Sequence, residues 1–264
     1  MLEKMKKYDK KIIYYSDELN DDFAGVKKPK FKLPKNFKFT HSNIFWRMTA
    51  FFVYRIIMTP FAYIYCKLKF RLKTVDNTRI KPDKKQGCFL YCNHTLLAGD
   101  AFIPSVIMFP KKVKVIVSTD NIATSLTRNF ILMSGAIPIP SSLKQFKPFL
   151  SAVQGEVAKG NCITVYPEAH IWPYYTKIRP FTKKSFNFPV KASSPVYVST
   201  TTFQKRKIGN TPKITVYLDG PFYPDDGLSL HEAEENLRNK VYRTMYNNSK
   251  NSTYTPIIYK RKEV

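Results

Sequence analysis

The sequence is poor in acidic residues and in cysteine. Its 264 residues hold 19 Asp and Glu against 44 Lys and Arg, which gives a formal net charge of +25. The four cysteines form no CxxC pair, so neither a zinc ribbon nor a disulfide framework is indicated, and we expect reduced, cytosolic thiols. The apolar run near the N-terminus is too short for a signal-peptide core, so export is not predicted.

What is present is the composition of a folded protein with anionic partners. With 44% hydrophobic and 15% aromatic residues, most of the chain is predicted to fold, and its length suits one large domain or two small ones. A large positive charge favours nucleic acid, lipid headgroups, an acidic carrier protein or phosphorylated substrates. Charge alone does not choose among these partners.

Residues 1–40 are interpreted as a basic N-terminal arm. Within them, residues 26–40 hold six lysines and no acid, with aromatic residues between the lysines. Two interpretations stay open. The stretch is a solvated linker, or it is attracted to an anionic surface, where each lysine contributes up to about 1 kcal/mol.

The most apolar stretch, residues 44–66, lies within a predicted membrane-binding segment of residues 41–72. It is long enough to span a bilayer, but Arg55 would then lie near the membrane centre at a cost of about 2.5–3.5 kcal/mol. Pro60 is expected to break the helix. We therefore predict a helical hairpin, two short helices in the membrane interface, with a buried core helix as the alternative.

Residues 73–264 are predicted to form an α/β domain. Short β-rich runs alternate with helical stretches, which is typical of a mixed, mostly parallel sheet flanked by helices on both faces. A helix is predicted over residues 142–159, and another begins at Ser229, where Glu232 completes a capping box. The predicted strands are residues 87–93, 113–119, 136–140, 161–166, 195–201 and 213–218.

Two loops after predicted strands carry the candidate chemistry, because catalytic side chains of α/β folds collect at the carboxyl ends of strands. In the first loop, Asn93 and His94 follow a strand, and Gly99 and Asp100 precede a helical stretch. A turn at Gly99 with positive φ is expected to bring Asp100 to one ring nitrogen of His94, leaving the other nitrogen free to take a proton from an alcohol. Equally open is a helix-capping Asp100 beside a structural histidine.

The second loop follows the strand at residues 161–166. It contains Glu168 and His170, followed by aromatic residues and by the cations Lys177 and Arg179. Pro167 is expected to direct Glu168 out of the sheet. The alternative for Glu168 is a salt bridge to Arg179 on the rim, which contributes little to stability.

Together the two loops resemble the glycerolipid acyltransferase family that includes bacterial 1-acylglycerol-3-phosphate O-acyltransferase. Asn93, His94 and Asp100 resemble its NHxxxxD block, and GAIPIP at residues 135–140 resembles its Gly-x-Ile block. YPEAH at residues 166–170 resembles its Phe-Pro-Glu-Gly-Thr-Arg block, and SPVYV at residues 194–198 resembles its Pro-Val block. The blocks agree in order and spacing over roughly residues 42–220.

The resemblance implies an O-acyltransferase of phospholipid biosynthesis, with His94 and Asp100 as catalytic residues. We therefore expect a fatty acyl group to pass from an acyl thioester, on acyl carrier protein or CoA, to a lysophospholipid such as 1-acylglycerol-3-phosphate, at the cytoplasmic face of the cell membrane. The thioester is a co-substrate, and no cofactor, metal or nucleic acid is expected. The expected substrate-binding residues are Asn93, Gly135, Glu168, His170, Lys177 and Arg179.

The sequence departs from the family at three places. Five residues separate His94 from Asp100 where the family usually has four. Ser141 stands where the family has an arginine in the second block, and Ala169, His170 and Ile171 fill the Gly-Thr-Arg positions of the third. Lys177, Arg179, Lys144 and Lys147 are candidate replacements for the phosphate-binding arginines, and another acceptor lipid is the alternative.

Three rival functions also follow from the residues. Cys92 and His94 share a face of one strand, as in a thiol acyltransferase or hydrolase. His94, Asp100, Glu168 and His170 have the residue types of a metallohydrolase without its usual spacing. The net charge and the lysine-rich arm suit a nucleic-acid-binding protein, although no recognition motif is present.

Overall fold

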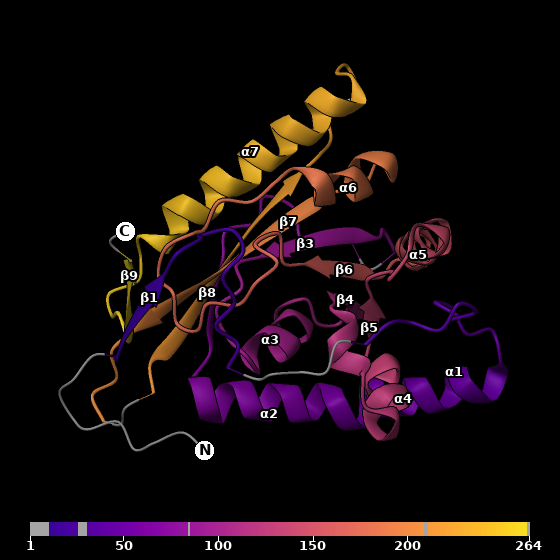
Figure 1. Cartoon of the computed structure of the whole chain (residues 1–264), viewed down its shortest axis with the longest axis horizontal. Coiled ribbons are helices and arrows are strands. Elements are labelled where there is room, and N and C mark those ends of the chain that lie inside the picture. Colours follow the sequence, from indigo (N-terminus) through magenta and orange to yellow (C-terminus); the bar gives the residue numbers. More distant parts are fainter. Residues whose placement is uncertain (1–10, 26–30, 84, 209–210, 263–264) are drawn as a thin grey trace.

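The computed structural model describes residues 11–25, 31–83, 85–208 and 211–262. At its centre is a seven-stranded sheet in the order β2-β8-β7-β3-β6-β4-β5 (Figure 1). The strands are β2 Lys73–Asp76, β3 Cys88–Cys92, β4 Val113–Val117, β5 Ala136–Pro138, β6 Cys162–Val165, β7 Val196–Gln204 and β8 Lys213–Phe222. Each of the six predicted strands is therefore present, with β2 in addition.

The sheet is mixed and mostly parallel, as predicted. Strands β3 to β7 all run in one direction, β8 is antiparallel to β7, and β2 is parallel to β8. Every residue of the central strands β3 and β6 is buried, because helices cover both faces of the sheet. The carboxyl ends of β3, β4, β5, β6 and β7 therefore lie along one edge, called the carboxyl edge below.

Helices form a layer on each face of the sheet (Figure 1). The α7 helix packs Leu237, Val241 and Met245 against the face that α5 also covers, and its first turn carries the predicted capping box between Ser229 and Glu232. The helix α3 covers the other face together with the long N-terminal helix. The bounds are α3 Gly99–Ile107, η2 Thr119–Ile122, α4 Ser125–Met133, α5 Leu143–Ala158, η3 Lys184–Phe186, α6 Asn187–Lys191 and α7 Leu230–Ser249.

The predicted helical hairpin is wrong, because one continuous helix occupies Ile44–Phe70. It consists of α1 Ile44–Phe51, a π-helical segment η1 Phe52–Met58, and α2 Thr59–Phe70. Pro60 does not break it, because the wider π turn ends just before the proline and the backbone N–H of Thr59 already donates to Tyr54. Pro60 then occupies the first turn of α2, where its missing N–H costs little.

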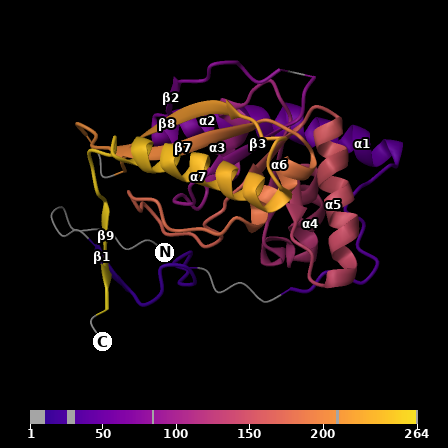
Figure 2. The ribbon, with the colours of Figure 1, turned by 90° about the horizontal axis from the view of Figure 1, so that it is seen from above.

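The two described ends of the chain pair with each other. Strand β1 Lys11–Tyr15 lies parallel to β9 Ile257–Arg261 in a separate two-stranded sheet (Figure 2). Of the basic arm, residues 1–10 and 26–30 lie outside the described residues, whereas residues 31–34 are fixed on the domain at the carboxyl edge. There the Phe31 N–H donates to Asp120 at 2.9 Å, and the Leu33 N–H donates to Ser141 Oγ at 2.9 Å. The division into arm, membrane-binding segment and catalytic domain stays a prediction.

Candidate active site

His94 and Asp100 meet in the turn between β3 and α3. Nδ1 of His94 lies 2.7 Å from Oδ2 of Asp100, and the same oxygen accepts the Leu96 N–H at 2.9 Å. The carboxyl group is buried, while 23% of the His94 side chain is exposed. Asp100 thus holds an imidazole that solvent can reach, and the cap of α3 at Ala98 receives no side-chain hydrogen bond.

Gly99 serves this turn in a different way from the one predicted. It does not adopt a positive φ but is the first residue of α3. A Cβ at this position would lie 2.7 Å from Leu96 Cδ1 and 3.2 Å from the Phe70 ring. Glycine is therefore required for close packing of the turn against α2.

The environment of Asp100 favours a hydrogen bond with the imidazole. Burial raises the pKa of the carboxyl group, and the hydrogen bond and charge of His94 oppose that rise without cancelling it. When the carboxylate accepts the proton on Nδ1, Nε2 of His94 carries a lone pair. The pair therefore has the arrangement of a general base whose tautomer and orientation are fixed by an acid.

Tyr166 is a part of the site that sequence reasoning missed. Its ring lies over the His94 ring with centroids 4.5 Å apart, and its hydroxyl donates to the backbone oxygen of Asp100 at 2.5 Å. Burial raises the pKa of Tyr166 well above its ordinary value, so the hydroxyl stays a donor. The sequence signals were its place between a strand end and Pro167 and its position as the first residue of the YPEAH block.

Glu168 braces the backbone beneath His94. One carboxylate oxygen accepts the His94 N–H at 3.0 Å, and the other accepts the Arg179 N–H at 3.0 Å. Oε2 also lies 3.5 Å from the Arg179 guanidinium, with both side chains buried. Burial raises the pKa of Glu168, although the Arg179 charge lowers it. The alternative of a salt bridge to Arg179 is therefore right about the partner and wrong about the place, because the pair lies inside the protein and not on the rim.

The Arg179 guanidinium faces inward and does not reach solvent. It also donates to the backbone oxygen of His170 and lies 5.0 Å from the ring centroid of Trp172. Trp172 in turn donates its backbone N–H to His94 O at 3.2 Å, and its indole N–H to Asp21 O at 2.7 Å. The loop after β6 thus holds the backbone of His94 from two points, Glu168 and Trp172.

The remaining predicted site residues lie apart from His94 or face other groups. The Asn93 carboxamide is buried and exchanges two hydrogen bonds with the backbone of Thr201, so it ties β3 to β7. His170 points to Asp22, with 3.7 Å between Nδ1 and Oδ2. Gly135 directly precedes β5, which is the outermost strand on one side of the sheet and lies three strands from β3. Lys177 is exposed.

The directions of these side chains have simple physical reasons. The sequence blocks give the order of the residues but not the direction of a side chain. Asn93 turns inward because the end of β3 pairs with β7, and Gly135 (φ +109°) packs against Val113 and Tyr54. Neither Asn93 nor Gly135 offers a free polar side chain to a substrate. Lys144 and Lys147 are exposed on the first turns of α5.

Two of the rival functions meet obstacles at this site. Cys92 is buried, and burial raises its pKa, so the thiol stays protonated and is a poor nucleophile. Among residues 11–25, 31–83, 85–208 and 211–262, no three His, Cys, Asp or Glu side chains are placed to hold a metal ion.

We compared the chain with protein-family models, curated sequences and solved structures, and only the solved structures gave a match. No protein-family model matches the chain, and no curated protein sequence does. Among solved structures, the chain shares its α/β fold with an acyltransferase.

That structure is the 1-acyl-sn-glycerophosphate (LPA) acyltransferase PlsC from Thermotoga maritima, with a TM-score of 0.50 and 14% sequence identity over 80% of this chain and 98% of that one. At this identity the likeness establishes the fold.

Proposed function

We propose that the protein is a membrane-associated O-acyltransferase. It moves a fatty acyl group from an acyl thioester, carried by acyl carrier protein or CoA, to a hydroxyl of a lysophospholipid such as 1-acylglycerol-3-phosphate. The observation that carries the proposal is the 2.7 Å contact between His94 Nδ1 and Asp100 Oδ2 at the carboxyl end of β3. The fold shared with an LPA acyltransferase supports the same conclusion.

In the proposed reaction, His94 is a general base. Nε2 takes the proton of the lipid hydroxyl as its oxygen attacks the thioester carbonyl, which forms a negatively charged tetrahedral intermediate. The intermediate collapses by breaking the carbon–sulfur bond, and the departing thiolate takes the proton back from His94. Asp100 stabilises the imidazolium between these steps, and no acyl-enzyme forms.

The membrane part of the proposal rests on charge and on the long helix. From Phe23 to Val75 the sequence contains no Asp or Glu, so an anionic bilayer meets no repulsion along this stretch. The helix over 44–70 is long and apolar enough to cross a bilayer by length and composition. It instead lies along the base of the domain, against α3 and α4 (Figure 1), which favours a helix in the membrane interface.

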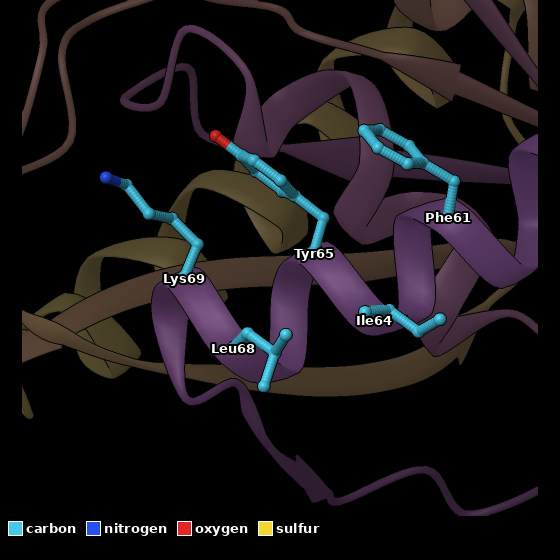
Figure 3. Close-up of a pocket in the computed structure, with 5 residues that line it drawn as sticks. All are labelled: Phe61, Ile64, Tyr65, Leu68 and Lys69. Atoms are coloured by element: carbon cyan, nitrogen blue, oxygen red, sulfur yellow. The ribbon is translucent and has the colours of Figure 1, made fainter.

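The exposed side of the helix has the character expected for such an interface. A shallow hollow of about 450 Å³ lies over α2, and none of its lining residues belongs to the His94 site. Figure 3 shows Ile64 and Leu68 on one side of α2, and Phe61, Tyr65 and Lys69 on another. Arg55 does not point to lipid, because its guanidinium donates to Pro110 O at 2.7 Å. We propose that the protein sits as a peripheral or monotopic protein on the cytoplasmic face of the cell membrane.

The test is a transfer assay with the purified full-length protein. Labelled acyl-CoA and acyl carrier protein thioesters are incubated with a panel of lysophospholipids in mixed phosphatidylglycerol vesicles, and the products are identified by mass. We expect a diacyl product from at least one acceptor, and full activity in the control variant Cys92→Ala. Absence of transfer to every lysolipid, or loss of activity in Cys92→Ala with an intact fold, would overturn the proposal.

A further inference from the structure

The carboxyl edge of the sheet carries a row of aliphatic side chains that water surrounds. Leu97, Leu126, Leu143 and Ile208 follow β3, β4, β5 and β7, and their exposed fractions are 58%, 89%, 93% and 82%. Leu126 and Leu143 are more exposed than any other large hydrophobic residue in the part of the chain that the structure describes. Only the loop after β6 breaks the row among these five parallel strands, and the paired ends of the chain cover that loop.

Cations outnumber acids around this row, where Asp120 after β4 accepts a backbone N–H of the basic arm. Arg128 lies on α4, Lys144 and Lys147 lie on α5, and the loop after β7 contains three basic residues in succession, Lys205 to Lys207. The sequence has no acid from residue 121 to residue 155, and none from residue 205 to residue 212. A negatively charged partner is therefore favoured over a positively charged one.

The opposite edge of the sheet provides the contrast. Ile80 follows β2 there and is 60% exposed, but Asp76 and Asp83 lie on either side of it in the sequence. Asp225 and Asp226 follow β8 at the same edge. Exposed aliphatic residues thus occur at both edges, but Leu126, Leu143 and Ile208 lie in acid-free, basic stretches of the sequence, whereas acids flank Ile80.

The row is continuous with the long helix. Helix α4, which bears Leu126, packs against α1 and η1 of the long helix (Figure 1). At the other end, the Arg206 guanidinium donates to the backbone oxygen of Lys69 near the end of α2. Two loops of the carboxyl edge therefore flank the helix that the proposed function places on the membrane.

We propose that the carboxyl edge is a second membrane-docking surface, and that its occupant is an anionic lipid bilayer. Aliphatic side chains of the loops after β4, β5 and β7 enter the interface, and the neighbouring cations contact lipid headgroups. His94 lies at the same edge, with Leu97 three residues after it. The surface therefore turns the general base toward the bilayer, so a lipid acceptor reaches Nε2 without leaving the interface. This inference rests on the proposed function.

Tryptophan quenching by brominated phosphatidylcholine in phosphatidylglycerol vesicles tests the proposal. The background variant Trp46→Phe keeps only Trp172, which is fully buried. One reporter is then added at a time: Phe45→Trp on the long helix, Leu126→Trp and Ile208→Trp on the carboxyl edge, and Ile80→Trp on the opposite edge. We expect quenching at positions 45, 126 and 208 and none at position 80.

The pattern of quenching separates the two proposals. Quenching at position 45 without quenching at 126 and 208 overturns the second docking surface and leaves the helix on the membrane. Absence of quenching at position 45 overturns membrane docking itself. Quenching at position 80 equal to that at 126 overturns the assignment to one edge.

A binding measurement gives the size of the effect. In the double variant Leu126→Asp, Leu143→Asp we expect vesicle affinity to fall roughly tenfold or more for each leucine, with Ile80→Asp as the matched control that binds normally. Circular dichroism checks that each variant folds. Normal vesicle binding by the double variant, or dimers of the native chain that the double variant abolishes, would overturn the lipid assignment.

Discussion

The loops after β3 and β6 hold the same kinds of residue and use them in opposite ways. Each has a histidine and a buried carboxyl group. In the β3 loop, Asp100 contacts the imidazole of His94, and that ring reaches solvent. In the β6 loop, Glu168 contacts only backbone N–H groups and Arg179, while the His170 imidazole turns away toward Asp22.

The difference teaches that the partner of a buried carboxyl group decides its use. A carboxylate that accepts a ring N–H fixes a tautomer and prepares a base, as at Asp100. A carboxylate that accepts backbone N–H groups fixes the chain, as at Glu168. The first loop therefore carries the proposed chemistry, and the second positions it.

The largest expected effect separates the two histidines. His94→Ala removes the proposed general base, and we expect acyl transfer to fall by a factor of about 10² to 10⁴. His170→Ala removes a half-exposed ring at the edge of the β6 loop, so its rate should stay close to that of the native protein. Initial rates and urea unfolding of both variants make the comparison, and equal losses of activity in both variants would contradict the division between the loops.

The second effect concerns the brace. Glu168→Gln leaves the Arg179 guanidinium buried without a charged partner and turns an amide N–H toward a backbone donor. We expect the free energy of unfolding to fall by about 3–5 kcal/mol. Asp100→Asn, by contrast, should lose activity with a smaller loss of stability, because no buried cation is left unpaired. Urea unfolding gives the two values, and a Glu168→Gln variant as stable as the native chain would show that the brace is dispensable.

A third prediction concerns the paired ends of the chain as a positioning device. Tyr259 of β9 stacks on Trp172 with centroids 4.9 Å apart, and Trp172 holds the backbone of His94. We expect Tyr259→Leu to lower kcat roughly tenfold with little change in KM, since small displacements of a reacting group cost rate. A shift in Trp172 fluorescence should accompany the loss.

The matched control for this position is Tyr246→Leu, which changes an exposed tyrosine on α7. It should leave both kcat and Trp172 fluorescence as they are in the native chain. If Tyr259→Leu raised KM alone, the ends of the chain would act on substrate binding and not on His94.

The sequence predicted the strands of the central sheet better than it predicted the N-terminal helix and the pairing of the two ends of the chain. Buried runs such as residues 88–92 and 162–165 are apolar on both faces, so they predict parallel strands directly. The hairpin failed because a π segment before Pro60 depends on backbone hydrogen bonds that no residue pattern displays. The pairing of β1 with β9 joins residues from opposite ends of the chain, and its anchor, Trp172, lies far from both in sequence.

The sequence indicated the candidate site only where residues that are close in sequence are also close in the structure. His94 and Asp100 lie on one turn, and their contact is one of the two interpretations that the sequence left open. Asn93 faces inward, and Gly135 lies beside the outermost strand β5, three strands from β3. The sequence blocks show neither of these placements. Tyr166 and Trp172 reach His94 from another loop. The YPEAH block includes Tyr166 but does not show that its ring lies over His94, and nothing in the sequence distinguishes Trp172 from the other aromatic residues.

The smallest expected effect concerns the backbone of the β6 loop at Ala169. Ala169 follows the brace residue Glu168 and adopts φ +62°, a left-handed conformation that costs a non-glycine residue about 1–2 kcal/mol. Ala169→Gly relieves this cost but adds about 0.4–1 kcal/mol of chain entropy to the unfolded state. We therefore expect a net stabilisation between zero and about 1.6 kcal/mol with unchanged activity, because no function is assigned to the methyl group of residue 169.

The control is Ala158→Gly, at the exposed end of α5, which should instead lower stability by up to about 1 kcal/mol. Thermal unfolding measures both changes. If Ala169→Gly reduced activity while raising stability, the strained backbone would be contributing to the geometry of His94. The β6 loop would then take part in catalysis through its conformation and would be more than a brace.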